Sequence, residues 1–328
     1  MTKKTYEVLG AEIAAVDDLL TVEKYPRPNI KVPVLSAVRH GGGPACTAMA
    51  AVAGLGGHAA FVARLGEDEL SRFLRRSLAA RGVDITHIVH DPASMPYHSY
   101  CINDRTTGER TIFYDSRSFR RISAADISDS LLAATRVLLL DFIADPAPVA
   151  LAQKARQAGV SVVLDMEGRS AEVTALCEHV DHLVVPEEFA QWRTGEADLS
   201  AACARLARHP RAATVVTAGV AGCWWTDSPD RPPVHRPAFK VQTVDTTGCG
   251  DTYHGAYALA IARGLPIAQA VTFAAACGAL KASGQGGGWD ALPTSGQVAT
   301  LLRSRLAEND PSRAMIATIE KWSCGHEK

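Results

Sequence analysis

The sequence predicts an α/β fold in which a mostly parallel sheet carries helices on both faces and a small β-sheet lies beside it. Two observations support this expectation. From about residue 123 onward, apolar strand patterns alternate with helix patterns, which is typical of parallel βα repeats. Two earlier segments form a hairpin pattern whose strands are less uniformly apolar, which is typical of a sheet with a solvated face. With 328 residues, the chain is long enough for one large domain, and we expect a single domain over residues 1–328.

The N-terminal third mixes short strand patterns with two helix patterns, separated by glycines and prolines. Apolar residues run up to Gly10 in the first strand pattern, and residues 31–39 alternate between apolar and polar side chains. Three glycines at positions 41–43 then precede a run of small residues that favours a helix. The strands expected here are 6–9, 20–23, 31–39 and 61–65, and the helices are 45–55 and 69–81.

The middle and C-terminal parts supply the hairpin and the βα repeats. Residues 99–103 and 111–115 form the two arms of the hairpin around Arg105-Thr106-Thr107-Gly108. Further along, apolar stretches rich in valine and leucine alternate with helix patterns. The strands expected in this part are 137–141, 160–165, 182–185, 214–218 and 241–244, and the helices are 147–158, 172–179, 199–207, 257–263 and 266–282.

Charge and cysteine usage exclude several classes of protein. The formal net charge is −1, so no basic surface favours nucleic acid or an anionic membrane. The eight cysteines are scattered and form no C-x-x-C pair, so we expect buried, reduced thiols and a cytoplasmic protein. The N-terminus lacks a signal-peptide core, and no apolar run reaches membrane-spanning length. We therefore expect neither a nucleic-acid partner nor a membrane partner.

The most informative stretch is residues 244–256, Val-Asp-Thr-Thr-Gly-Cys-Gly-Asp-Thr-Tyr-His-Gly-Ala. A strand pattern ends, two glycines permit a tight turn, and a helix begins. The backbone N–H groups of Gly248, Cys249 and Gly250 would then point outward from a helix N-terminus, which favours an anion. Asp251 lies in the same turn and can accept a proton from an attacking hydroxyl, an arrangement suited to phosphoryl transfer. A helix-capping role for Asp251 is the alternative.

This stretch resembles the C-terminal signature of the ribokinase-like (PfkB) carbohydrate kinases, and the resemblance extends over nearly the whole chain. The N-terminal half contains the glycine loop at 41–43, a helix of small residues, Gly66-Glu67-Asp68 and Arg81-Gly82-Val83-Asp84, as that family does. The resemblance implies the family's three-layer fold, with a β-sheet lid over the sugar from about 12–40 and 97–118. It also implies an ATP- and Mg²⁺-dependent kinase for a primary hydroxyl of a small sugar, and a homodimer formed through the lid.

The same resemblance assigns residues to ATP. The nucleotide-binding residues that it implies are Thr217, Gly219 and Gly222, in a loop after a strand, and Gly284 and Gly286, in a glycine-rich loop. An ordinary turn and a flexible loop are the alternatives for these two segments. The chain has no G-x-x-x-x-G-K-[ST] motif, so it is not a P-loop enzyme.

Two kinds of metal ion are also implied. Asp245 and Thr247 would help to hold a monovalent cation such as K⁺, together with backbone carbonyls from 279–284. The alternative for Asp245 is a turn residue that bonds its own loop. The Asn-x-x-Glu motif of the family falls at Pro186-Glu187-Glu188-Phe189, where neither key residue is in register. Glu187 is therefore expected to act on Mg²⁺ only through water.

On the sugar side, the resemblance indicates residues of the N-terminal part. Asp17 matches a hydroxyl-binding aspartate by its spacing, with Asp18 as the second candidate and a solvated turn as the alternative for both. Gly42 and Gly43 would let the backbone approach the sugar. Cys46 stands where many members have a sugar-binding asparagine, so a plain ribokinase is less favoured.

The identity of the sugar stays open. Residues 41–45, 237–241 and His254 look most like bacterial sulfofructose kinases, and Lys31 matches a lysine that those enzymes place near the sulfonate. The arginine that they place on the sulfonate falls at Ile143 in this chain. A solvated surface lysine is therefore the alternative for Lys31.

Other residues indicate other acceptors. Tyr114 replaces an asparagine of the sulfofructose kinases, whereas Tyr25-Pro26 and residues 108–112 look similar to ketohexokinase and favour a ketose. A nucleoside kinase of the same fold is one alternative, because Tyr97 and Phe113 offer rings for stacking on a base. A non-catalytic sugar sensor is another, supported by the altered Asn-x-x-Glu motif.

Overall fold

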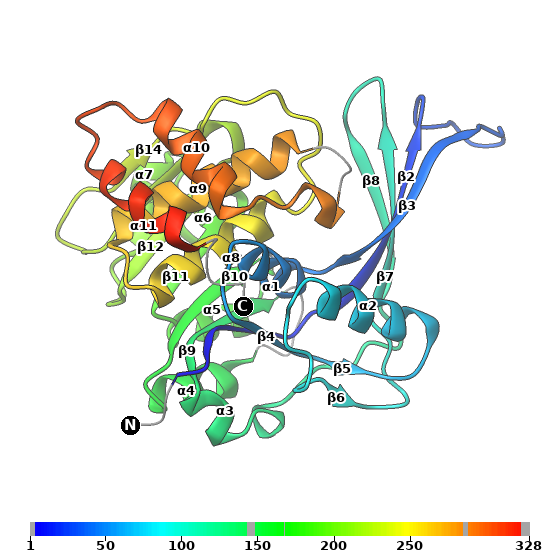
Figure 1. The fold of residues 1–328 in the computed structure, drawn as a ribbon, viewed down its shortest axis with the longest axis horizontal. Coiled ribbons are helices and arrows are strands. Elements are labelled where there is room, and N and C mark those ends of the chain that lie inside the picture. Colours follow the sequence, from blue (N-terminus) through cyan, green and yellow to red (C-terminus); the bar gives the residue numbers. More distant parts are fainter. Residues whose placement is uncertain (1–3, 143–147, 167, 285–287, 323–328) are drawn as a thin grey trace.

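The computed structural model describes residues 4–142, 148–166, 168–284 and 288–322. Within these residues the main sheet has eight strands in the order β14-β13-β12-β11-β10-β9-β1-β4 (Figure 1). The strands from β12 to β4 in this order are parallel, whereas β13 and β14 complete one edge as antiparallel strands. These strands are β1 (Tyr6–Ala11), β4 (Ala59–Val62), β9 (Thr135–Phe142), β10 (Ser161–Met166), β11 (His182–Pro186), β12 (Ala213–Thr217), β13 (Cys223–Thr226) and β14 (Val234–Arg236).

Successive residues of β9 show how this sheet separates two apolar layers. Val137 and Leu139 belong to the core on one face, and Leu138 and Leu140 belong to the core on the other. The alternation follows from the period of two in a strand. The predicted fold, a mostly parallel sheet with helices on both faces, is therefore confirmed. The first layer contains α1 (Pro44–Gly54), α2 (Glu69–Ala80), α8 (Cys249–Ala262), α9 (Ile267–Ser283), α10 (Ser295–Arg305) and α11 (Ile316–Glu320); the second contains α3 (Asp129–Ala133), α4 (Val149–Gln157), α5 (Ala171–Cys177), α6 (Glu187–Thr194) and α7 (Leu199–Leu206).

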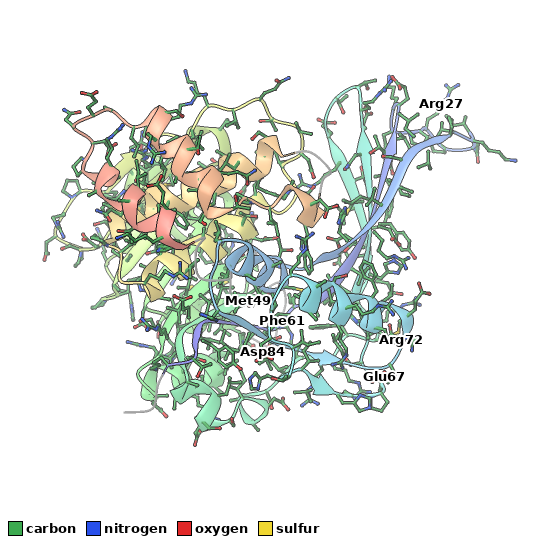
Figure 2. The ribbon with its side chains drawn as sticks, in the orientation of Figure 1. Arg27, Met49, Phe61, Glu67, Arg72 and Asp84 are labelled. Atoms are coloured by element: carbon green, nitrogen blue, oxygen red, sulfur yellow. The ribbon has the colours of Figure 1, made fainter. Side chains whose placement is uncertain are left out.

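Helices α1 and α8 approach each other closely at one end of the main sheet. A Cβ added at Gly255 of α8 would lie 2.4 Å from the Ala48 carbonyl oxygen of α1, so the contact requires glycine. Met49 of α1 packs beside Phe61 of β4 in the same core (Figure 2). Short 3₁₀ helices connect other elements: η1 (Ala124–Asp126), η2 (Gly219–Ala221), η3 (Gly288–Ala291) and η4 (Pro311–Met315).

A second, four-stranded sheet, called the small sheet below, stands beside the main body at the right of Figure 1. Strands β2 and β7 are parallel, and β3 and β8 pair antiparallel at the two edges. The predicted small sheet and its hairpin are therefore confirmed. Its strands are β2 (Ala15–Val22), β3 (Val34–Gly42), β7 (Tyr97–Asp104) and β8 (Arg110–Asp115); a further pair is formed by β5 (Arg64–Leu65) and β6 (Val89–His90).

The predicted strand at 241–244 is wrong. Residues 237–248 contain neither strand nor helix. Instead, the amides of Val244 and Asp245 donate to the Ala282 carbonyl at 2.7 and 3.2 Å, which ties this segment to the end of α9. β-branched residues favour a strand only where a neighbouring strand can pair with them, and this segment has helix α9 as its hydrogen-bonding neighbour.

Two details of the small sheet also differ from expectation. The strand expected from residue 31 begins at Val34, the first residue to pair with β2, because Pro33 has no N–H to donate. Lys31 therefore lies in the loop before β3. Asp17 and Asp18 lie inside β2 rather than in a loop, because the backbone of β2 pairs with β3 on one side and with β7 on the other at both positions.

Candidate active site

The glycine-rich signature forms the N-terminus of α8. Gly248 precedes the helix with φ of 74°, a left-handed conformation that favours glycine. Asp251 lies in the first helical turn. The amide of Cys249 donates to the Thr246 carbonyl at 3.2 Å, so it is used within the turn. A Cβ added at Gly250 would meet nothing within 4 Å, which leaves the backbone open to an approaching anion.

A single hollow joins this helix to the small sheet. It receives residues from β2, β3, α1, α8, α9 and η3, so segments at opposite ends of the chain meet there. Asp17, Thr247, Gly248 and Asp251, which the sequence indicated, all line it. The complete lining is Asp17, Leu19, His40, Gly41, Thr47, Thr247, Gly248, Asp251, Lys281, Gly288 and Trp289.

Asp17 and Asp18 lie on opposite faces of β2 because successive side chains of a strand alternate. Asp17 faces the hollow, where burial raises the pKa of its carboxyl above the usual value, against a hydrogen bond from Ser99. Asp18 instead accepts hydrogen bonds from Arg39 at 2.7 and 2.9 Å and lies 2.7 Å from His98 Nε2. The hydrogen bonds from Arg39 lower the pKa of Asp18. Asp17 is therefore the carboxylate available to a ligand in the hollow.

The other predicted sugar residues surround Asp17 in different ways. A Cβ added at Gly42 would lie 2.1 Å from Asp17 Oδ2, so this glycine makes room for the carboxylate itself. Gly43 has φ of 87° and precedes α1. Cys46 is fully buried, and burial raises the pKa of its thiol well above the usual value. It is its neighbour Thr47, rather than Cys46, that lines the hollow.

Sequence reasoning did not indicate the other seven lining residues, which are Leu19, His40, Gly41, Thr47, Lys281, Gly288 and Trp289. The indole of Trp289 donates to Thr47 Oγ1 at 3.0 Å and lies against Gly41, where a Cβ would come within 2.3 Å of the ring. His40 packs against Gly288 in the same way, since a Cβ added at Gly288 would come within 2.4 Å of the imidazole ring. Burial lowers the pKa of that imidazole. Lys281 is another, and its position inside an otherwise apolar helix pattern was a signal that could have found it.

His254 fixes the first turn of α8 to the main sheet. Its Nδ1 lies 2.8 Å from the Gly250 carbonyl oxygen, and its Nε2 lies 3.0 Å from the Val184 carbonyl oxygen. Two acceptors favour a ring that carries a proton on both nitrogens. The Asp165 carboxylate also lies 3.2 Å from Nδ1. The turn that carries Gly250 and Asp251 is thus anchored to β10 and β11.

The residues predicted for ATP lie at the carboxyl ends of β11 and β12. Thr217 ends β12, Gly219 begins η2 and Gly222 follows it. Gly222 also has a structural reason to be glycine, because a Cβ there would lie 2.1 Å from the Arg236 carbonyl oxygen. Glu187 is the first residue of α6, directly after β11.

Of the two remaining ATP candidates, Gly284 follows α9. Gly284 packs against Ala291, where a Cβ would come within 2.7 Å of the alanine Cβ. Gly286 lies outside the described residues, as does Ile143.

Lys31 differs most from the other predicted site residues in its surroundings. It is exposed, in the loop between β2 and β3 that also carries Arg27 at the tip of the small sheet (Figure 2). It does not line the hollow. Arg110 of β8 does reach the signature, since its guanidinium donates to Thr246 Oγ1 at 3.0 Å. The small sheet therefore contacts the turn before α8 through Arg110.

Two searches of the described residues gave negative results. No group of three or more His, Cys, Asp or Glu side chains is arranged to hold a metal ion there. Among the helices of the same residues, none combines the length and apolar character needed to cross a membrane.

Comparison with known proteins agrees with this geometry. The family described as pfkB family carbohydrate kinase matches residues 11–294. The chain is 31% identical over 293 residues to Fructokinase-1 of Oryza sativa subsp. japonica, covering 80% of this chain and 88% of that protein. It is equally 31% identical over 291 residues to Fructokinase-1 of Zea mays, with the same coverage of 80% and 88%. The structure of Arabidopsis thaliana ribokinase complexed with ribose and ATP shares the fold, with a TM-score of 0.79 and 23% identity over 92% of this chain and all of that one. This chain therefore belongs to the pfkB family of carbohydrate kinases.

Proposed function

We propose that the protein transfers a phosphoryl group from ATP to a primary hydroxyl of a small sugar, and that the sugar is a ketose. The observation that carries this proposal is the hollow that Asp17 of the small sheet and Asp251 of α8 line together. One carboxylate is placed to accept hydrogen bonds from sugar hydroxyls. The other lies in the first turn of a helix, where phosphate oxygens are favoured.

The reaction follows from these two positions. Asp251 accepts the proton of the attacking hydroxyl while the new phosphorus–oxygen bond forms and the bond to ADP breaks. The backbone at the N-terminus of α8, around Gly248 and Gly250, stabilises the charge on the phosphoryl oxygens during transfer. The proton then passes from Asp251 to solvent when the products leave.

ATP is expected at the carboxyl ends of β11 and β12, beside Thr217, Gly219 and Gly222. Gly284 and Gly286 are proposed to border the adenine. Mg²⁺ bound with ATP neutralises charge on the phosphates. Glu187, at the start of α6, is proposed to hold water around that ion.

We further propose that the small sheet is a lid that excludes water and pairs with a second copy of the chain in the cytoplasm. Several of its strand residues expose large apolar side chains, which is typical of an interaction surface. These residues are Val34, Leu35, Val38, Tyr100, Ile112, Phe113 and Tyr114, each at least 42% exposed. Sedimentation at micromolar concentration tests this role. We expect a dimer, and a monomer would contradict the proposal.

The ketose assignment rests on the similarity to the two fructokinases. Lys31 favours sulfofructose within this class, because an ammonium on the lid loop would attract a sulfonate. A nucleoside acceptor is the second candidate, since Tyr114 and Phe113 are exposed rings on β8.

The test is a panel of acceptors scored for ADP release at saturating ATP and Mg²⁺. Fructose, sulfofructose, ribose and adenosine cover the open choices, and a reaction without acceptor measures background ATP hydrolysis. We expect the highest kcat/KM for a ketose, with phosphorus NMR placing the new ester on a terminal carbon. Highest efficiency with adenosine would replace the ketose proposal by the nucleoside one. Sugar binding by calorimetry without any ADP release would identify a sensor.

A further inference from the structure

The surroundings of Asp245 fit the expected monovalent cation poorly. Such an ion needs several oxygen ligands around Asp245 and Thr247, with carbonyls from 279–284 as the expected donors. The Ala282 carbonyl already accepts two amides, at 2.7 and 3.2 Å. The carbonyls of Ala279 and Leu280 accept the Ser283 hydroxyl at 3.2 and 3.1 Å. These oxygens are therefore used within the protein.

A side-chain ammonium lies where the positive charge of that ion would be needed. Lys281 Nζ is 3.9 Å from Asp245 Oδ2, and the Lys281 side chain is only 1% exposed. Within the described residues, Nζ has no hydrogen-bond partner. A buried ammonium without full compensation is costly, so this one is expected to gain a partner when the enzyme binds its ligands.

The direction of the Lys281 side chain indicates which ligand. Lys281 lines the hollow together with Gly248 and Asp251. A Cβ added at Gly248, the residue before α8, would lie 3.8 Å from Lys281 Cε. The hydroxyl oxygen of Thr247, in the same hollow, is also buried without a hydrogen-bond partner. An ammonium and a hydroxyl without hydrogen-bond partners therefore line the same hollow as the first turn of a 14-residue helix.

We propose that Lys281 is a built-in replacement for the monovalent cation and acts as a positioning residue for phosphoryl transfer. Its ammonium holds Asp245, and thereby the turn from 245 to 248, while its charge attracts the phosphoryl group at the N-terminus of α8. This inference rests on the proposed kinase function. It implies that the enzyme works equally well without potassium.

The first test compares monovalent salts on the unaltered enzyme. Turnover is measured at constant ionic strength in potassium chloride and in tetramethylammonium chloride, whose cation is too large for the turn. We expect the two rates to agree within about twofold, since the charge is part of the chain. A potassium activation of about tenfold or more would overturn the proposal.

The second test removes the charge. Lys281→Met keeps most of the side-chain volume and should lower kcat/KM for ATP by about tenfold or more, the scale of a charge-assisted contact. Part of that loss should return in potassium chloride and not in tetramethylammonium chloride, because a small cation can enter the space left by the ammonium. Lys321→Met, an exposed lysine near the C-terminus, is the matched control and should behave as the unaltered enzyme.

A readout other than activity separates this proposal from the kinase proposal. The thermal midpoint of Lys281→Met should rise in potassium relative to tetramethylammonium, whereas the midpoints of the unaltered protein and of Lys321→Met should not. This shift is expected even if no acceptor in the panel is phosphorylated. A Lys281→Met protein with unchanged kinetics and no selective response to potassium would show that the lysine is only structural. If that variant does not fold, the salt comparison on the unaltered protein and Lys281→Gln decide the question.

Discussion

The main sheet and the small sheet are stabilised in different ways. In the main sheet, Leu138, Leu139 and Leu140 of β9 are fully buried, because helices cover both faces. In the small sheet, every residue of β8 from Arg110 to Tyr114 is exposed. The main body is therefore fixed by packing on both faces, whereas the small sheet depends on strand pairing and on a few charged contacts. We infer that the main body keeps the residues proposed for phosphoryl transfer in fixed positions, while the small sheet can move over the sugar.

The two regions meet along a seam of glycines. Gly41 lies against Trp289 and Gly288 lies against His40 across the two regions, and Gly42, next to Gly41, lies against Asp17 within the small sheet. None of these contacts leaves room for a Cβ. A shift of the small sheet would therefore also shift the residues that line the hollow. The predictions below separate the contributions of the two regions, beginning with the largest expected effect.

The largest effect should come from the main body. Asp251→Asn should lower turnover by about 10²–10⁴-fold, the usual contribution of a general base, because an amide cannot accept the hydroxyl proton. The thermal midpoint should stay the same, since the change is nearly isosteric and the residue is partly exposed. Steady-state kinetics and thermal unfolding measure the two quantities.

The matched control for this variant is Asp230→Asn, an exposed aspartate in a distant loop, which should change neither quantity. Turnover of Asp251→Asn within threefold of the unaltered enzyme would remove Asp251 from the role of base.

The next effect should arise at the seam. Gly42→Ala places a methyl group where Asp17 Oδ2 now lies, so the carboxylate must rotate out of the hollow. Losing its charge-assisted hydrogen bonds should raise the KM for sugar by about 10–100-fold and leave the KM for ATP nearly unchanged. An equal change in both constants would show that the seam supports the whole hollow rather than the sugar alone.

A pH-dependent effect is expected at the base of the small sheet, where Glu12 follows β1. Glu12 is 1% exposed and lies 3.1 Å from Arg121, and burial raises the pKa of its carboxyl to about 7. A folded pKa above the unfolded value means that this group favours folding most at acid pH. Its contribution is lost as pH rises from about 4.5 through about 7.

Between pH 5 and pH 8, the thermal midpoint of the unaltered protein should therefore fall by roughly 2–6 °C more than that of Glu12→Gln. The comparison of the two pH profiles is the measurement. Parallel profiles would mean that Glu12 is charged in the folded protein throughout this range.

The smallest effect should come from the outer face of the small sheet. Arg39→Met removes the contacts to Asp18 and a 3.0 Å contact to Glu69 of α2. These side chains are partly solvated, so the loss should be about 0.5–1 kcal/mol of unfolding free energy. Because Arg39 lowers the pKa of Asp18, the difference from the unaltered protein should disappear as pH falls below about 4. A tenfold change in sugar KM would instead place this face in the sugar site.

The same contrast explains how much of the molecule could be predicted from the sequence. The strands of the main sheet were recognisable because residues such as Val137 to Leu140 are apolar on both faces. The hairpin of the small sheet was recognisable from its turn. The segment at 241–244 was misassigned because β-branched composition does not report whether a pairing partner exists.

Within the candidate site, the signature identified Asp251 and Gly248, since their spacing is local. Lys281 and Trp289 could not be assigned in the same way. Each enters the hollow only because α9 and η3 fold back beside α8. The apolar helix pattern around Lys281 marks the lysine as unusual, but it does not show which residues the lysine meets.

The composition of the hollow has a consequence for how such a protein can diversify. Under the proposed function, its sugar-side lining comes from residues 17–47 and its phosphate-side lining from residues 247–289. Recombination within the first part of the gene can therefore exchange acceptor preference and leave the donor chemistry intact. Trp289 is the exception, because it is encoded with the phosphate side but packs on Gly41 of the sugar side. A graft of β2 and β3 from a relative must preserve the glycine under that indole, or carry a smaller side chain at 289 with it.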